Sequence, residues 1–217
     1  EGYWAEHARR LISWKKPFTK VLNESNAPFF KWFEDGTLNA SYNCLDRNVE
    51  RGLGDKTAII FEADGGEVTK VTYSQLLAKT CQIANALKSL GIKKGDRVII
   101  YISMSIDGVA AMQACARIGA IHSVVFGGFA SHSLATRIDD ATPVAIVSAD
   151  AGSRGGKGVP YKPLLDEAIK LASHKPAAVL MVDRKLAPYT PVAGRDHDYA
   201  TLRQKHMNTQ VPCEWVD

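Results

Sequence analysis

From residue 97 onward the sequence alternates between short apolar runs and amphipathic stretches, and this alternation limits the fold more than any other feature. Four runs are apolar along most of their length and rich in β-branched residues: 97–103, 121–126, 144–149 and 178–183. Stretches with helical spacing of apolar residues lie between them, near 106–118, 131–140 and 161–173. Strands that are apolar on both sides are typical of a parallel sheet with helices on both faces. The sequence therefore predicts an α/β fold built on a doubly wound, mainly parallel sheet.

Two further elements are expected upstream, before an aromatic-rich beginning. The β-prone runs 57–63 and 68–73 are joined across Asp64-Gly65-Gly66, a hairpin signal, and Ser74 is a plausible N-cap for a helix that stops at Gly91. Three of the four tryptophans and a Phe-Phe-Lys-Trp-Phe cluster fall in the first 50 residues, which are too few and too rich in turns to build a core alone. We therefore expect an N-terminal arm over residues 1–55 that wraps the core, and an α/β subdomain over residues 56–217.

The composition excludes several classes of protein. The chain has 217 residues, 46% hydrophobic and 23% charged, with a net charge of +4, so disordered and low-complexity chains are excluded. No run is long and apolar enough to suggest a membrane span, no secretory signal begins the sequence, and the basic residues form no nucleic-acid patch. Four widely spaced cysteines without metal-ligand spacing predict free thiols, two of them buried at Cys81 and Cys115. These features favour a cytoplasmic location, and no oligomeric state is predicted.

Two strand ends carry unusual sequences, at the edge of the sheet where open parallel sheets bind ligands. One strand runs into Gly127-Gly128, and another runs into a loop that contains Arg154, Gly155, Gly156 and Lys157. Two cations beside glycines, whose backbone N–H groups can face a ligand, are suited to holding phosphate. The loop is not a Walker motif, because the spacing differs and glycine follows Lys157. Two alternatives stay open: the basic loop can be a solvated connection, and the Gly pair can be a tight turn.

The remaining polar residues give weaker signals. His122 lies within an apolar run and is expected to be a satisfied buried histidine. Asp139 and Asp140 look like a solvated helix end, and three other aspartates appear isolated: Asp46, Asp150 and Asp183. No metal site is predicted. The residues alone therefore indicate a ligand-binding α/β domain and assign no reaction.

The sequence also resembles the AMP-forming acyl-CoA synthetases of the adenylate-forming superfamily, in the acetate and propionate branch. The resemblance covers essentially the whole chain, and its most specific stretch is Ala-Cys-Ala-Arg-Ile-Gly-Ala-Ile-His-Ser-Val-Val-Phe-Gly-Gly-Phe at 114–129. Shorter matching motifs are Tyr-Trp-Ala-Glu-His-Ala-Arg-Arg at 3–10, Trp-Lys-Lys-Pro-Phe at 14–18, Leu-Asp-Arg at 45–47, Thr-Tyr-Ser-Gln-Leu at 72–76 and Gly-Asp-Arg-Val at 95–98.

Within the branch, three stretches look more like propionyl-CoA synthetases than acetyl-CoA synthetases. They are 129–140, 148–157 and 194–203, and in the second of them Lys157 stands where acetate enzymes tend to carry a second Arg. The resemblance therefore favours propionate as the substrate, with acetate as the alternative.

The resemblance implies a two-step ligation that uses ATP, Mg²⁺ and CoA. A short-chain carboxylate attacks the α-phosphate of ATP, and the CoA thiol then attacks the acyl carbon of the adenylate and expels AMP. CoA-binding residues are implied at Arg154, Gly155, Gly156, Lys157, Gly127 and Gly128, whereas no catalytic residue and no metal ligand of the family is matched. The family's phosphate loop is expected beyond residue 217, so we expect an N-terminal fragment that is inactive alone. Two other readings are a non-catalytic CoA-binding module and a purely structural domain.

Overall fold

The computed structural model describes residues 1–216 and centres on a five-stranded, wholly parallel sheet. The sheet order is β11-β10-β7-β5-β6. Along the chain β5 comes first and β6 second, so the order is 2-1-3-4-5 and reverses between β5 and β7. The strands span Arg97–Ile102 (β5), Ile121–Phe126 (β6), Ala145–Ala149 (β7), Ala178–Val182 (β10) and Asp196–Asp198 (β11).

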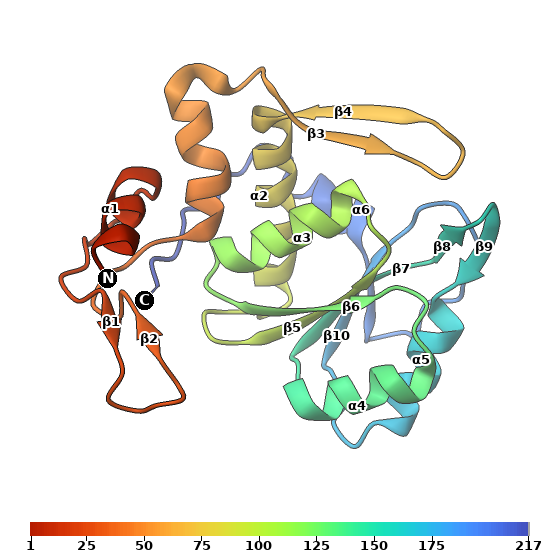
Figure 1. Cartoon of the computed structure of the whole chain (residues 1–217). Helices are drawn as coiled ribbons and strands as arrows, with labels where there is room; N and C mark the ends of the chain where they lie inside the picture. The colour runs from red at the N-terminus through yellow and green to blue at the C-terminus, as the bar shows by residue number, and fades with distance from the viewer. Residues whose placement is uncertain (217) are drawn as a thin grey trace.

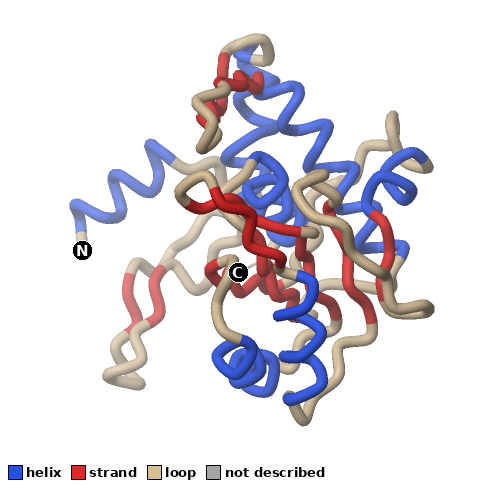
Figure 2. Tube along the Cα trace, turned by 90° about the vertical axis from the view of Figure 1, so that its right-hand side faces the viewer, coloured by secondary structure: helices blue, strands red, loops and turns tan. Residues whose placement is uncertain are grey.

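Helices cover both faces of this sheet, which confirms the predicted α/β class (Figure 1). On one side lie α2 (Tyr73–Ser89), α3 (Ile106–Arg117) and α6 (Tyr199–Gln204), and on the other α4 (Ser131–Ala141) and α5 (Lys162–Leu171). Figure 2 shows the same layers after a quarter turn, with helices above and below the central strands. The largest buried side chains belong to this layered core and include Tyr101, Ile99, Ile146, Leu165 and Leu180.

The edge strand β6 differs from the prediction of strands buried on both faces. Four of its six residues are apolar, yet only Val125 is buried. The strand pairs with β5 alone, so one lateral edge and much of its surface stay uncovered. His122 lies on this uncovered strand and is exposed, so the prediction of a buried His122 is wrong.

Upstream of the sheet, β3 (Thr57–Glu62) and β4 (Val68–Thr72) form the predicted antiparallel hairpin. The N-cap of α2 is Thr72 and not Ser74: its hydroxyl accepts from the Gln75 N–H, and the Gln75 side chain accepts from the Thr72 N–H. This reciprocal capping box satisfies the backbone N–H groups of both Thr72 and Gln75.

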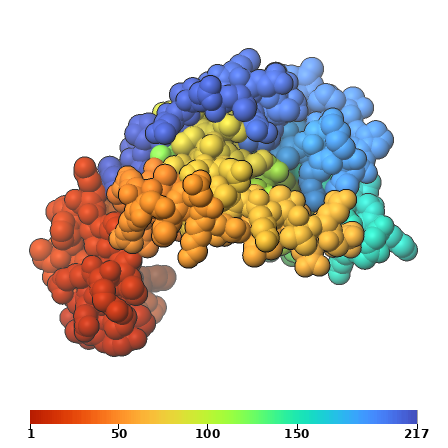
Figure 3. All heavy atoms as spheres, turned by 90° about the horizontal axis from the view of Figure 1, so that it is seen from above, coloured from red at the N-terminus to blue at the C-terminus, as the bar shows by residue number. Residues whose placement is uncertain are grey.

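The N-terminal residues form a lobe at one end of the molecule (Figure 3). A small buried cluster of Ala5, Ala8 and Phe18 holds α1 (Gly2–Leu11) against the segment that contains Trp14 and Phe33. The remaining elements are the two-residue strands β1 (Leu22–Asn23) and β2 (Lys31–Trp32) and the π-helical segments η1 (Tyr42–Asp46) and η2 (Val49–Leu53). No helix within residues 1–216 has both the length and the apolar character needed to cross a bilayer.

Candidate functional site

The carboxyl ends of β5 and β7 flank the point where the sheet order reverses, which is where open α/β sheets bind ligands. β7 is followed there by Asp150 and by a hairpin of two short strands, β8 (Ala151–Arg154) and β9 (Lys157–Pro160). The sequence analysis placed a glycine-rich loop here, and the structure has a hairpin instead, with only its turn as a loop. Gly155 and Gly156 have φ of +58° and +74°, so they form the two-residue turn with positive φ that suits a tight hairpin.

Arg154 and Lys157 face each other across this turn as register partners, and both are exposed. Side chains of directly opposed residues lie on the same face of a hairpin, where two like charges repel. Neither cation is in an ion pair with any residue that the structure describes. The tip of the hairpin is therefore a doubly charged cationic edge that an anion can neutralise.

Gly127 and Gly128 lie at the base of the same hairpin, as the shared sheet edge predicted. A Cβ added to Gly127 would lie 2.7 Å from the Tyr161 hydroxyl oxygen and 2.8 Å from the Ser103 backbone nitrogen. Gly128 has φ of +89°, and a Cβ there would approach a Val159 methyl group at 3.7 Å. Both the close approach and the tight turn therefore require glycine. The pair is separated from the cationic tip by about 7 Å of strand, because Lys157 lies two residue steps along β9 from Val159, which Gly128 approaches.

Two tyrosines that the sequence did not single out hold this base in place. Tyr161 is 4% exposed and fills the space between Gly127 and Gly152, where a Cβ on Gly152 would lie 1.8 Å from its hydroxyl oxygen. The Tyr101 hydroxyl donates to the Phe129 carbonyl (3.0 Å) and accepts from the Gly128 N–H (3.2 Å). Burial raises the pKa of Tyr101 to about 12, so it remains protonated and keeps donating at neutral pH. Nothing in the sequence pattern distinguishes these tyrosines from ordinary core aromatics.

The sequence suggested that Asp150 is isolated, and that prediction is wrong. Asp150 is a buried hydrogen-bond acceptor at the same edge. Its carboxylate is 1% exposed and accepts the backbone N–H groups of Arg184 (2.8 Å), Leu186 (2.7 Å) and Ala187 (2.9 Å). The Arg184 side chain in turn donates to the Ser103 hydroxyl at 2.5 Å. These bonds join the segment after β10 to the ends of β5 and β7.

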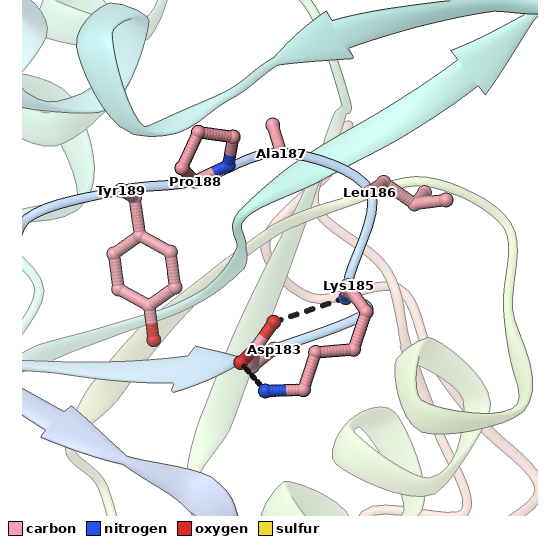
Figure 4. Close-up of a pocket in the computed structure, with 6 residues that line it drawn as sticks. All are labelled: Asp183, Lys185, Leu186, Ala187, Pro188 and Tyr189. Carbon is pink, nitrogen blue, oxygen red and sulfur yellow. Dashed lines mark hydrogen bonds and ion pairs between the residues drawn. The ribbon is translucent and has the colours of Figure 1, made fainter.

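A cavity of about 430 Å³ lies in that segment, lined by Asp183 and residues 185–189. Figure 4 shows Lys185 folded back so that its backbone N–H and its ammonium group both meet the Asp183 carboxylate. The six site residues predicted from the sequence do not line this cavity, within the part of the chain described. The hairpin borders the segment, since a Cβ on Gly158 would lie 3.9 Å from the Leu186 carbonyl oxygen.

The other polar candidates take structural positions. Asp139 accepts the His174 backbone N–H at 2.8 Å, and Asp46 forms a two-bond ion pair with Arg117 (2.7 and 2.8 Å). All four cysteines are free. Among residues 1–216, no three His, Cys, Asp or Glu side chains are grouped so that they could hold a metal ion.

Comparison with known families places this geometry in context. Residues 45–212 match the family described as AMP-binding enzyme, and this stretch contains the whole parallel sheet and the hairpin. The chain belongs to that family. Residues 1–44 match a second family description, the N-terminus of acetyl-coenzyme A synthetase.

Curated relatives of this chain are also named acetyl-coenzyme A synthetase. Proteins named acetyl-coenzyme A synthetase are 63% identical in Cupriavidus metallidurans and 60% in Cupriavidus necator, each over 85% of this chain and 28% of the relative. The protein of that name in Burkholderia mallei is 58% identical over 100% of this chain and 33% of its own length. The chain thus spans about a third of the length of these relatives. These relatives are named for acetate, the alternative substrate of the sequence analysis, and not for propionate.

Proposed function

We propose that this chain is the N-terminal part of an AMP-forming acetyl-CoA synthetase and that its β8–β9 hairpin holds CoA. In the proposed reaction, acetate attacks the α-phosphate of ATP to give acetyl-adenylate and pyrophosphate, and the CoA thiol then displaces AMP. Family membership, the matched N-terminal segment and the names of the relatives support the proposal. The described residues contain no cluster suited to Mg²⁺, so no step that uses the ion is assigned to them.

The cationic tip of the hairpin is the observation that carries the CoA assignment. Arg154 and Lys157 stand opposite each other without ion-pair partners, and the open Gly155-Gly156 turn between them leaves backbone N–H groups accessible. A phosphate group of the CoA nucleotide is suited to this edge, since Arg can bind it through two nitrogens and Lys as a point charge. Gly128 is exposed and gives the ligand a surface without a side chain at the base of the hairpin, whereas the buried Gly127 lets the turn pack closely against Tyr161.

Acetate is proposed as the carboxylate because the relatives that match the chain are named for it. Propionate, favoured by three sequence stretches, is the competing outcome. The two are separated by measuring AMP release with each acid, using the protein that contains this chain. A kcat/KM for acetate above that for propionate supports the proposal, and the reverse order contradicts it.

CoA, ATP and a carboxylate are small molecules, and we propose no nucleic-acid or membrane partner. Four free cysteines, two of them buried in the core, fit a reducing compartment, so we propose the cytoplasm as the site of action.

Titration of the 217-residue chain with CoA and with dephospho-CoA tests the site by calorimetry. We expect CoA to bind more tightly, and Arg154→Ala to weaken CoA by about 10-fold or more, the size of a lost charge-assisted hydrogen bond. The matched control is Lys170→Ala, which removes an exposed cation on α5 and should change neither affinity. Equal binding of the two ligands, or an Arg154→Ala variant that binds like the unaltered chain, contradicts the assignment.

The same preparations test the alternative of a CoA-binding module without chemistry. If the longer protein binds CoA through the hairpin but releases no AMP with either acid, the module is the correct reading. If AMP release depends on the acid and on CoA, the ligase is the correct interpretation.

A further inference from the structure

We propose that Arg184 is a positioning residue that fixes the direction of the cationic hairpin tip, with Asp150 holding the backbone that carries it. The proposal deepens the CoA site proposed above and rests on it. Arg184 lies outside the six residues implied by the sequence and acts through the hairpin instead of through the ligand.

The Arg184 guanidinium joins the ends of three strands. It follows β10, its Nη1 donates to the Ser103 hydroxyl after β5 at 2.5 Å, and the same nitrogen lies 3.4 Å from the Ala151 carbonyl oxygen at the start of β8. The strand order reverses between β5 and β7, so the side chain spans the reversal point and meets the hairpin at its first residue.

Asp150 fixes both the hairpin and the segment that carries Arg184. Its side chain accepts the backbone N–H groups of Arg184, Leu186 and Ala187, while its carbonyl oxygen accepts the Tyr161 N–H at 2.9 Å, directly after β9. A carboxylate that is 1% exposed has lost its contact with water and needs such donors to satisfy its oxygens. One residue therefore anchors the beginning and the end of the hairpin to the segment after β10.

The hairpin depends on these anchors because a two-stranded hairpin is only marginally stable in water by itself. Away from its base, the side chain of Ser153 reaches the exposed Asp64 of the β3–β4 turn at 2.8 Å. Arg154 is three residues, or about 10 Å, beyond Ala151, so a small rotation at the base moves the tip by a larger distance. Loss of the Arg184 contacts should therefore affect recognition at the tip without removing any group from it.

The test compares Arg184→Ala, Arg184→Lys and Ser103→Ala with the unaltered chain in two measurements. The first is the ratio of the dissociation constants for dephospho-CoA and CoA, which reports phosphate recognition. The second is amide hydrogen exchange in residues 151–160 compared with the strands of the main sheet.

We expect Arg184→Ala to lower the ratio of the two dissociation constants by about 5- to 10-fold, because a misdirected tip weakens the charge-assisted contact with phosphate. The same variant should accelerate hydrogen exchange selectively in the hairpin. Ser103→Ala should act in the same direction by a smaller factor. Arg184→Lys retains a cation that can serve the same two oxygens, and should restore most of the ratio.

An unchanged ratio with unchanged hairpin exchange in Arg184→Ala overturns the proposal. So does accelerated exchange throughout the sheet, because that result indicates general destabilisation. If Arg154→Ala also leaves CoA binding unaltered, the CoA site itself is wrong. If Arg154→Ala weakens CoA and Arg184→Ala does not, only the positioning role is wrong. If the chain binds no CoA, the site proposal fails and selective hairpin exchange alone decides whether Arg184 orders the tip.

Discussion

Replacing Gly152 with alanine should destabilise the protein through one identifiable contact. The added Cβ would lie 1.8 Å from the Tyr161 hydroxyl oxygen and 2.4 Å from the ring carbon that bears it, far inside van der Waals contact. Tyr161 is 4% exposed and cannot move into solvent without leaving its packing against Tyr101. Overpacking of a filled site costs about 1–3 kcal/mol, and this contact belongs at the upper end, about 2–3 kcal/mol.

Urea unfolding and thermal melting measure the cost. For a chain of this size, about 2–3 kcal/mol corresponds to a fall in Tm of about 4–12 °C. Gly158→Ala is the matched control in the same hairpin, because its Cβ would meet only the Leu186 carbonyl oxygen at 3.9 Å and its φ is not positive. We expect Gly158→Ala to stay within about 0.5 kcal/mol of the unaltered chain. The reasoning is refuted if both variants have the same stability, or if Gly152→Ala remains as destabilising when Tyr161 is also replaced by alanine.

Three further predictions concern charge and thiols. Asp46→Asn breaks a largely buried two-bond pair with Arg117 and should cost about 3 kcal/mol in urea unfolding; a loss below about 1 kcal/mol contradicts this. Burial alone would raise the pKa of Asp196, but hydrogen bonds from Arg195, the Val192 N–H and Lys162 outweigh this effect and hold the pKa below its usual range. The stabilisation is therefore present above the unfolded pKa and is lost as the pH falls through the folded one, and Asp196→Asn should flatten the acid limb of a stability–pH curve. Cys44 is exposed, whereas burial raises the pKa of Cys115 to about 12, so a thiol reagent should label Cys44 in the native protein and Cys115 only after unfolding; early labelling of Cys115 contradicts the packing.

Much of the fold was predictable because its signals are local and repeated. The apolar runs of β5, β7 and β10 and the helices between them follow from periodicity alone, and the elements occur where the sequence places them. The exposure of β6 was not predictable in this way. An apolar edge strand has the same sequence pattern as a central one, and only the strand order shows which strands have one neighbour.

The candidate site was also predictable only in part. The glycines at 127–128 and the cations at 154 and 157 were identifiable from their residue types and from their position after two strands. The hairpin was missed although Gly155-Gly156 is a turn signal, because glycine-rich flanks give its strands little β propensity. Asp150, Tyr161 and Arg184 act through contacts that the sequence pattern does not show, and the partners of the Asp150 side chain lie more than 30 residues away in the sequence.

The central claim is that the hairpin tip and the Gly127-Gly128 turn form one ligand surface for CoA. A two-dimensional amide NMR titration of the ¹⁵N-labelled chain with CoA tests it most directly. The account predicts the largest shift changes at Gly155, Gly156, Gly127 and Gly128, with smaller changes at the first two when dephospho-CoA is used. Changes confined to other surfaces, such as the cavity lined by residues 185–189, contradict it.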